Sequence, residues 1–149
     1  MSTATLEAFD TLLIERDRLI KASQEITFRA LLDELGPEGQ MPGGVPFPMK
    51  IEPWPGGRWF RDLGDNAGHL WGHVQVIKPP ALLEISGPMF MSYPAISHVQ
   101  YRLTPEAAGT RLKLVHRAMG LIPRDHKEGV SMGWEHSLER VQELAEAKR

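Results

Sequence analysis

The sequence contains no cysteine among its 149 residues. Disulfide bridges, zinc sites built from thiolates and cysteine nucleophiles are therefore excluded together. The absence of cysteine also fits a reducing cytosol, where disulfides are rare.

Long apolar runs and clustered positive charge are missing as well. No stretch approaches the ~20 apolar residues that span a bilayer, and Glu7 and Asp10 stand where a signal peptide would be apolar. The 17 lysines and arginines are scattered among 19 acidic residues, so no basic stripe is available to neutralise phosphates. We therefore expect a cytoplasmic protein that binds neither nucleic acid nor membrane.

The composition that remains is typical of a globular domain, with 42% hydrophobic and 24% charged residues. A chain of this length is expected to form one domain, residues 1–149. Residues 11–22 alternate between apolar and charged side chains, which predicts a first strand. Ser23 is a good N-cap for a helix that ends at Gly36. The apolar stripe of this helix is Phe28, Leu31, Leu32 and Leu35.

The segment of residues 36–48 holds four glycines and four prolines, too many for a helix or a strand. A loop of this length in a small domain is often a lid or the edge of a binding site. Residues 49–119 then read as about six short strands separated by turn signals, joined mainly as antiparallel hairpins.

The chain closes with a long amphipathic helix. Asp125 followed by Glu128 matches a capping box at its start. Its apolar stripe is Val130, Trp134, Leu138, Val141 and Ala145. A single antiparallel sheet must bury one face, and this helix is the natural cover, so the sequence predicts an α+β fold.

Residues 129–133 spell G-x-S-x-G, the string of a serine-hydrolase nucleophile elbow. An elbow follows an apolar strand, whereas residues 123–128 here begin a helix. The only later histidine, His136, lies on that same helix. We therefore interpret Ser131 as an ordinary helix residue and predict no catalytic residue.

His69 and His73 are four residues apart, a spacing that could bind zinc on a helix. Their surroundings alternate as in a strand, where the same spacing is ~13 Å, too long for one ion. We expect two partly exposed histidines flanking Trp71 on one face of the sheet, and no metal site.

His116 has Leu112 and Leu114 on its side of a strand, while charged residues occupy the other side. It should therefore point inward, and Tyr101 should do the same with Val99. His116 is then either a core histidine with satisfied hydrogen bonds or a residue that lines a pocket, and burial should lower its pKa. Trp134 is expected in the core or in a cavity wall, and Trp59 near the rim of the sheet.

Several strings carry a resemblance to a known family. They are Ala22-Ser23, PGGRWF at 55–60, WGHVQVIKPPALLEIS at 71–86, TRLKLVHRAMG at 110–120, and GW at 133–134 followed by Leu138. The order of elements over residues 12–147 resembles the START-like SRPBCC superfamily, in the branch related to activators of the heat-shock-protein ATPase (AHSA-type domain). The resemblance implies a helix-grip fold, in which a curved seven-stranded antiparallel sheet wraps around a long C-terminal helix. It also implies a cavity for apolar molecules. The second short helix usual in the family is replaced here by residues 36–48.

On this basis the leading hypothesis is non-catalytic binding of a small apolar ligand, such as a lipid, a sterol or a polyketide-like molecule, with no cofactor. His116 and Tyr101 would orient the polar end of the ligand. The residues expected to line the site are Trp59, Leu70, Val74, Val99, Tyr101, Leu114, His116, Val130, Trp134 and Leu138.

Two alternatives come from other classes. One is a cyclase- or lyase-like enzyme with His116 as general acid or base, although no carboxylate shares its face. The other is a chaperone-linked or regulatory module that binds a protein through an outer sheet face carrying His69, Trp71 and His73. The sequence leaves open whether the chain forms a homodimer.

Overall fold

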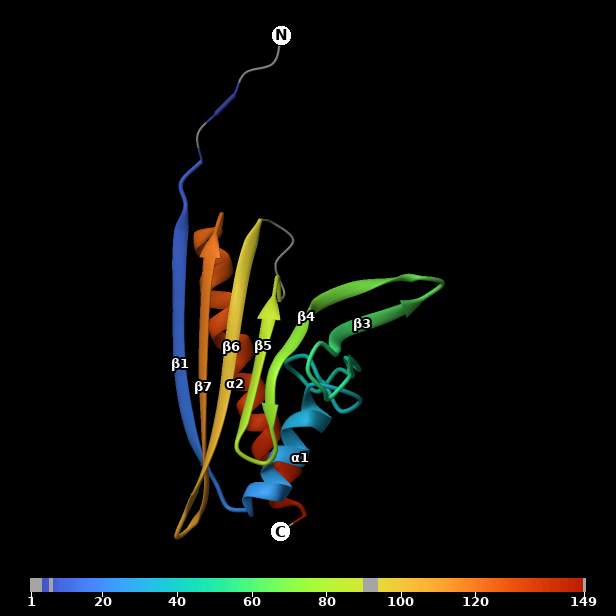
Figure 1. The fold of residues 1–149 in the computed structure, drawn as a ribbon, viewed down its shortest axis with the longest axis vertical. Helices are drawn as coiled ribbons and strands as arrows, with labels where there is room; N and C mark the ends of the chain where they lie inside the picture. Colours follow the sequence, from blue (N-terminus) through green and yellow to red (C-terminus); the bar gives the residue numbers. More distant parts are fainter. Residues whose placement is uncertain (1–3, 6, 90–93, 149) are drawn as a thin grey trace.

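The computed structural model describes residues 4–5, 7–89 and 94–148, so the expected domain of residues 1–149 includes a few positions outside the described part. The strands form a seven-stranded antiparallel sheet in the order β1-β7-β6-β5-β4-β3-β2. Figure 1 shows α2 along one face of this sheet and α1 beside the C-terminal half of α2. The elements are β1 (Asp10–Ile20), α1 (Gln24–Glu34), β2 (Lys50–Ile51), β3 (Arg58–Gly64), β4 (Ala67–Lys78), β5 (Leu82–Gly87), β6 (Ala95–Glu106), β7 (Gly109–Gly120) and α2 (Arg124–Glu146). The predicted α+β helix-grip fold is confirmed.

The first strand and the first helix lie close to their expected positions. β1 pairs with β7 along its whole length, from Asp10 opposite Gly120 to Ile20 opposite Thr110. The Ser23 side chain accepts a hydrogen bond of 3.2 Å from the Ile26 N–H, as expected of an N-cap. The expected cap at Gly36 is wrong. Leu35 is the C-cap and keeps a right-handed backbone, so the chain needs no left-handed residue there.

The long helix α2 buries the predicted stripe, of which Trp134 is 2% exposed and Leu138 1% exposed. The capping box is wrong, because the N-cap is Pro123, which has no side-chain donor or acceptor. Asp125 lies inside the first turn instead, where its negative charge is favourable near the positive end of the helix dipole. Neither helix of the described part is long and apolar enough to cross a membrane.

The inward faces of β6 and β7 are those predicted from alternation. Tyr101 pairs with Leu114 and Val99 pairs with His116, and all four side chains are fully buried. Trp59 was expected near the rim of the sheet, and it lies at the start of β3, the strand next to the edge strand β2. Its ring is 1% exposed, and its indole N–H donates a hydrogen bond of 2.7 Å to the Leu35 carbonyl. Trp59 therefore joins β3 to the end of α1.

A bulge in β4 changes which side chains face inward. Trp59 pairs with Gly72 and Phe60 pairs with Leu70, so Trp71 has no partner on β3. Trp71 turns into the core, and its indole N–H lies 3.2 Å from the Met49 sulfur. His69 stacks on the Trp71 ring and is exposed, as is His73. An outer face that displays Trp71 between two histidines is therefore wrong.

Candidate ligand-binding site

A pocket of about 400 Å³ opens between the end of α1, segment 36–48 and the N-terminal half of α2. Its volume is in the range typical of small-molecule sites. Apolar and aromatic side chains make most of the wall, and a few polar groups interrupt it. The lining residues are Glu34, Leu35, Gln40, Met41, Pro42, Phe47, Met49, Trp59, His126, Gly129, Val130, Gly133, Trp134, His136 and Ser137.

Backbone hydrogen bonds close segment 36–48 on itself, and its Phe47 ring contacts β3. The Phe47 N–H donates to the Gly39 carbonyl (2.8 Å), and the Met49 N–H donates to the Gly36 carbonyl (2.9 Å). The guanidinium carbon of Arg61 lies 3.8 Å from the centre of the Phe47 ring. These contacts place Phe47 and Met49 in the pocket wall.

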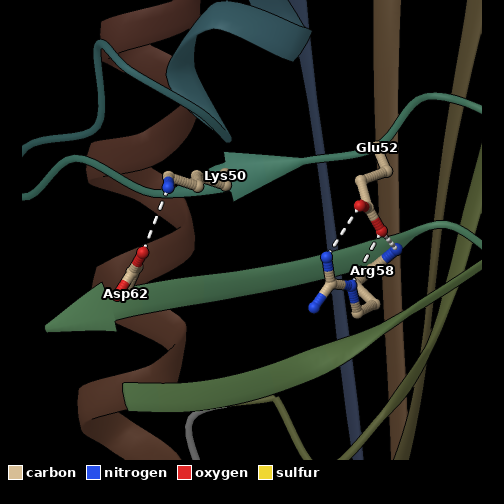
Figure 2. A network of polar contacts seen from close by, with 4 residues as sticks. All are labelled: Lys50, Glu52, Arg58 and Asp62. Carbon is tan, nitrogen blue, oxygen red and sulfur yellow. Dashed lines mark hydrogen bonds and ion pairs between the residues drawn. The ribbon is translucent and has the colours of Figure 1, made fainter. Parts of the chain in front are cut away.

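Ion pairs fix the strand that follows this segment (Figure 2). The Lys50 ammonium of β2 lies 3.1 Å from the Asp62 carboxylate of β3. Glu52 accepts hydrogen bonds of 2.8 and 2.9 Å from the backbone and side chain of Arg58, which lower its pKa to about 2. These contacts add to the backbone pairing of β2 with β3, and Met49, the residue before β2, lines the pocket together with Trp59 of β3.

Two glycines of α2 leave space in the pocket. Gly129 and Gly133 are four residues apart, so they lie on one face of the helix. A Cβ atom added at either position would meet nothing within 4 Å. Neither backbone is left-handed, so no turn requires glycine here. Glycine in a helix interior costs ~0.5–1 kcal/mol relative to alanine. The open space beside these two positions therefore comes with a loss of helix stability.

The G-x-S-x-G string is thereby explained without a nucleophile. The two glycines face the pocket, whereas the Ser131 hydroxyl accepts a hydrogen bond from the Arg16 guanidinium of β1. The rejection of the elbow, made from sequence context, agrees with this geometry.

Replacing Ser131 by alanine should change the free energy of unfolding by less than ~1 kcal/mol. The Arg16 guanidinium keeps Glu135 as an ion partner at 3.3 Å, so its charge stays compensated. Urea unfolding followed by circular dichroism measures the change. Loss of an esterase activity in this variant would contradict our interpretation of Ser131.

Glu34 is the buried acid of the site. It ends α1, is 4% exposed, and its Oε2 accepts a hydrogen bond of 2.6 Å from the Ser137 hydroxyl. Burial raises the pKa of this carboxyl to about 7, although the Ser137 hydrogen bond and the positive charge of Arg140 both act to lower it. Glu34 therefore exchanges its proton near neutral pH. Sequence reasoning missed it, although its place three residues after Leu31 puts it beside the apolar stripe.

Tyr101 lies behind Trp134, which is part of the pocket wall. Their rings meet edge to face, with centroids 6.3 Å apart. The Tyr101 hydroxyl is buried and has no hydrogen-bond partner among the residues that the structure describes. Burial, and then the nearby charge of Glu34, raise the pKa of Tyr101 well above its ordinary value.

His116 is a core histidine with both ring nitrogens engaged. Its Nδ1 accepts a hydrogen bond of 2.8 Å from the Trp134 indole N–H. The ring proton must then lie on Nε2, which donates to the Ser97 hydroxyl at 2.9 Å. Burial, with a smaller contribution from the charge of His98, lowers the pKa of His116 to about 4. Of the two interpretations left open by the sequence, the structure supports the satisfied core residue.

The structure separates the expected site residues into three groups. Trp59, Val130 and Trp134 line the pocket. Leu70 does not, because the bulge in β4 turns it to the outer face, where it is 45% exposed. The expected placement of Leu70 is therefore wrong. The others are buried in the core without lining the pocket, because Trp134 and its neighbours fill the space beneath the sheet. They are Val74, Val99, Tyr101, Leu114, His116 and Leu138.

The pocket-lining residues that were not expected from the sequence come mainly from two parts of the chain. Segment 36–48 was expected to be a lid or a binding edge, but none of its side chains was named. Gln40, Met41, Pro42 and Phe47 line the pocket. The second place is α2, where His126 and Ser137 extend the face of Val130 and Trp134 by one turn or less at each end. Helical periodicity could have found these two.

Comparisons with known proteins identify the family. The family model described as Activator of Hsp90 ATPase homolog 1-like protein matches residues 46–146. A comparison with curated proteins found no match.

Solved structures share the fold at low sequence identity. An uncharacterized protein from Rhizobium leguminosarum is 18% identical, with a TM-score of 0.73 over 97% of this chain and 100% of that one. CalU16 from Micromonospora echinospora is 23% identical, with a TM-score of 0.60 over 93% and 87% of the two chains. DynU16, from the dynemicin biosynthetic locus, is 18% identical, with a TM-score of 0.64 over 90% of this chain and 47% of that one. Because the family model spans well over half of the sequence, the chain belongs to the family of Activator of Hsp90 ATPase homolog 1-like proteins.

Proposed function

We propose that this protein binds a small apolar ligand in the pocket between α1, segment 36–48 and α2, without catalysing a reaction on it. The observation that carries the proposal is the pair of helical glycines at the pocket wall, whose missing side chains hold the volume open at a cost to helix stability. The fold of the family is consistent with a ligand-binding domain.

The chemistry of the wall indicates the class of ligand. Phe47 offers a partly exposed aromatic ring, the buried rings of Trp59 and Trp134 close the wall behind it, and Met41 and Met49 offer flexible thioethers that adapt to irregular shapes. A lipid, a sterol or a polyketide-like molecule would bury most of its surface there. DynU16, one of the proteins that share this fold, comes from a biosynthetic locus, which suits a small-molecule partner.

The two alternatives receive less support from the geometry. His116 does not line the pocket, and both its ring nitrogens are occupied, so it is not placed to transfer a proton to a ligand. The protein-interaction alternative relied on Trp71 at the outer face, and that ring is buried. The family description alone links the chain to a chaperone.

Replacing Gly133 by leucine should reduce the affinity for an apolar molecule at least tenfold without destabilising the protein. The new side chain would enter the empty space beside Trp134, and leucine is a better helix former than glycine by ~1 kcal/mol. Binding is measured by the fluorescence of N-phenyl-1-naphthylamine, a neutral apolar probe, and by mass spectrometry of any molecule that copurifies. Stability is measured by urea unfolding.

The matched control is Met132→Leu, one position away on the same helix. Met132 is 73% exposed and faces away from the pocket, so this variant should bind the probe as the wild type does. If Gly133→Leu folds and still binds the probe with unchanged affinity, the ligand does not occupy this pocket and the proposal fails.

A further inference from the structure

Among the polar residues of the pocket wall, Glu34 and Ser137 are joined by a hydrogen bond, and His136 is the neighbour of Ser137 on α2; we call these three residues the polar end. We propose that the polar end selects apolar molecules whose head group is a hydrogen-bond donor, neutral or positively charged, and rejects those that end in an anion. This inference rests on the proposed function and adds the chemical class of the ligand.

The hydrogen-bond pattern leaves an acceptor available to a ligand. The Ser137 hydroxyl donates its hydrogen bond to Oε2 of Glu34. No hydrogen bond within the described part of the chain engages Oε1 of the same carboxyl, and Glu34 lines the pocket. An ionised carboxylate accepts hydrogen bonds only, so it suits an alcohol, a phenol or an amine.

The charges around Glu34 do not turn the polar end into an anion site. Arg140 of α2 is the nearest cation that acts on Glu34, and its guanidinium lies 3.3 Å from both Glu38 and Glu143. Its charge is thus shared with two other carboxylates. Tyr101 of β6 faces Glu34 with a neutral hydroxyl. The Nε of Arg140 is buried without a partner in the described structure, but Arg140 does not line the pocket. A ligand anion would therefore meet the buried carboxylate of Glu34 in the pocket wall, which is unfavourable.

Two histidines of α2 complete the titratable groups of the pocket. His126 and His136 both belong to its wall, and Nε2 of His136 is buried without a hydrogen-bond partner in the described structure. This unpartnered nitrogen is a second polar atom at the polar end that a ligand head group could satisfy. Because both histidines line the same pocket, the test must separate their contribution from that of Glu34.

The experiment uses three probes with the same decyl chain: 1-decanol, decylamine and decanesulfonate. Their charges are constant between about pH 5.5 and 8.5, so any change with pH comes from the protein. Each affinity is measured by displacement of N-phenyl-1-naphthylamine. We expect the ratio of decylamine to decanesulfonate affinity to rise at least tenfold from pH 5.5 to 8.5, while the decanol affinity changes less than threefold.

Two variants assign the effect to Glu34. Glu34→Gln keeps the shape of the side chain and removes its charge, so the rise in the ratio should disappear. Ser137→Ala removes a hydrogen bond that favours the ionised carboxylate, so the same rise should occur at a higher pH. If Ser137 had a purely structural role, its removal would not shift the pH at which the affinity ratio rises.

The outcomes distinguish this inference from the proposed function. If decanol binds and the ratio stays constant with pH, the selection by charge is overturned and apolar binding stands. If the ratio rises equally in Glu34→Gln, His126 or His136 causes it, and the assignment to Glu34 is overturned. If neither the fluorescent molecule nor any of the three probes binds, both the selection and the proposed function fail.

Discussion

Replacing Trp134 by alanine should lower the free energy of unfolding by about 3–5 kcal/mol. Trp134 is 2% exposed, and its ring packs edge to face on Tyr101 and on His116. The substitution removes the largest side chain of the buried stripe of α2 and leaves a cavity. It also takes away the N–H donor to Nδ1 of His116, which would then be a buried acceptor without a partner.

Urea unfolding of the wild type and two variants measures these contributions. Trp134→Phe is the matched control, because it keeps most of the ring volume and removes the N–H donor. It should cost ~1–2 kcal/mol, the usual penalty for an unsatisfied buried polar atom. A loss below ~1 kcal/mol in Trp134→Ala would mean that the ring contributes to a pocket wall without supporting the core.

The second large effect is the dependence of stability on pH that His116 and Glu34 produce in opposite directions. The pKa of His116 is about 4 in the folded protein, against 6.5 in an unfolded chain. The ring must therefore gain a proton on unfolding below pH 6.5. Its contribution to stability is complete above pH 6.5 and is lost as the pH falls toward 4, by about 3 kcal/mol in total.

Glu34 acts with the opposite sign. Its pKa is about 7 in the folded protein, against 4.5 in an unfolded chain. The folded protein therefore holds a proton that the unfolded chain releases above pH 4.5. The contribution of Glu34 is complete below pH 4.5 and is lost as the pH rises to about 7, again by about 3 kcal/mol.

Because the two contributions oppose each other, the wild type should show a shallow dependence of stability on pH between about 4 and 7. His116→Gln should become less stable as the pH rises through this range, and Glu34→Gln should become less stable as it falls. Urea unfolding at several pH values checks both slopes, and the difference from the wild type cancels the exposed groups. A His116 ring that titrates near 6.5 by NMR would contradict the slope expected for Glu34→Gln, which His116 alone produces.

The fold was predictable because its signals are local and repeated. Alternation placed Tyr101 and His116 on inward faces, and helical spacing placed Trp134 and Leu138 on the buried stripe of α2. The position of Leu70 was missed because a bulge shifts the alternation of β4 by one residue; Gly72 next to it was the available signal, since a glycine inside a strand often marks a bulge.

The candidate site was predictable only in part, because it depends on how the elements pack. The sequence placed a cavity beneath the centre of the sheet, whereas Trp134 fills that space and the pocket lies beside segment 36–48. The hydrogen bond between Trp134 and His116 forms only because α2 lies across β7, and the spacing of residues in the sequence does not show this packing. Gly129 and Gly133 were visible in the sequence, but their role depends on the empty space next to them.

The pairing of β1 with β7 also has a consequence for the order of folding. Asp10 lies opposite Gly120, so this edge of the sheet can close only after almost the whole chain is available. Contacts between distant segments form late, because closing a long loop costs entropy. During synthesis the backbone N–H and C=O groups of β1 therefore stay unpaired until β7 is made, and other chains could pair with them. Its run Glu15-Arg16-Asp17-Arg18 places alternating charges in its middle, and these discourage aggregation until β7 arrives.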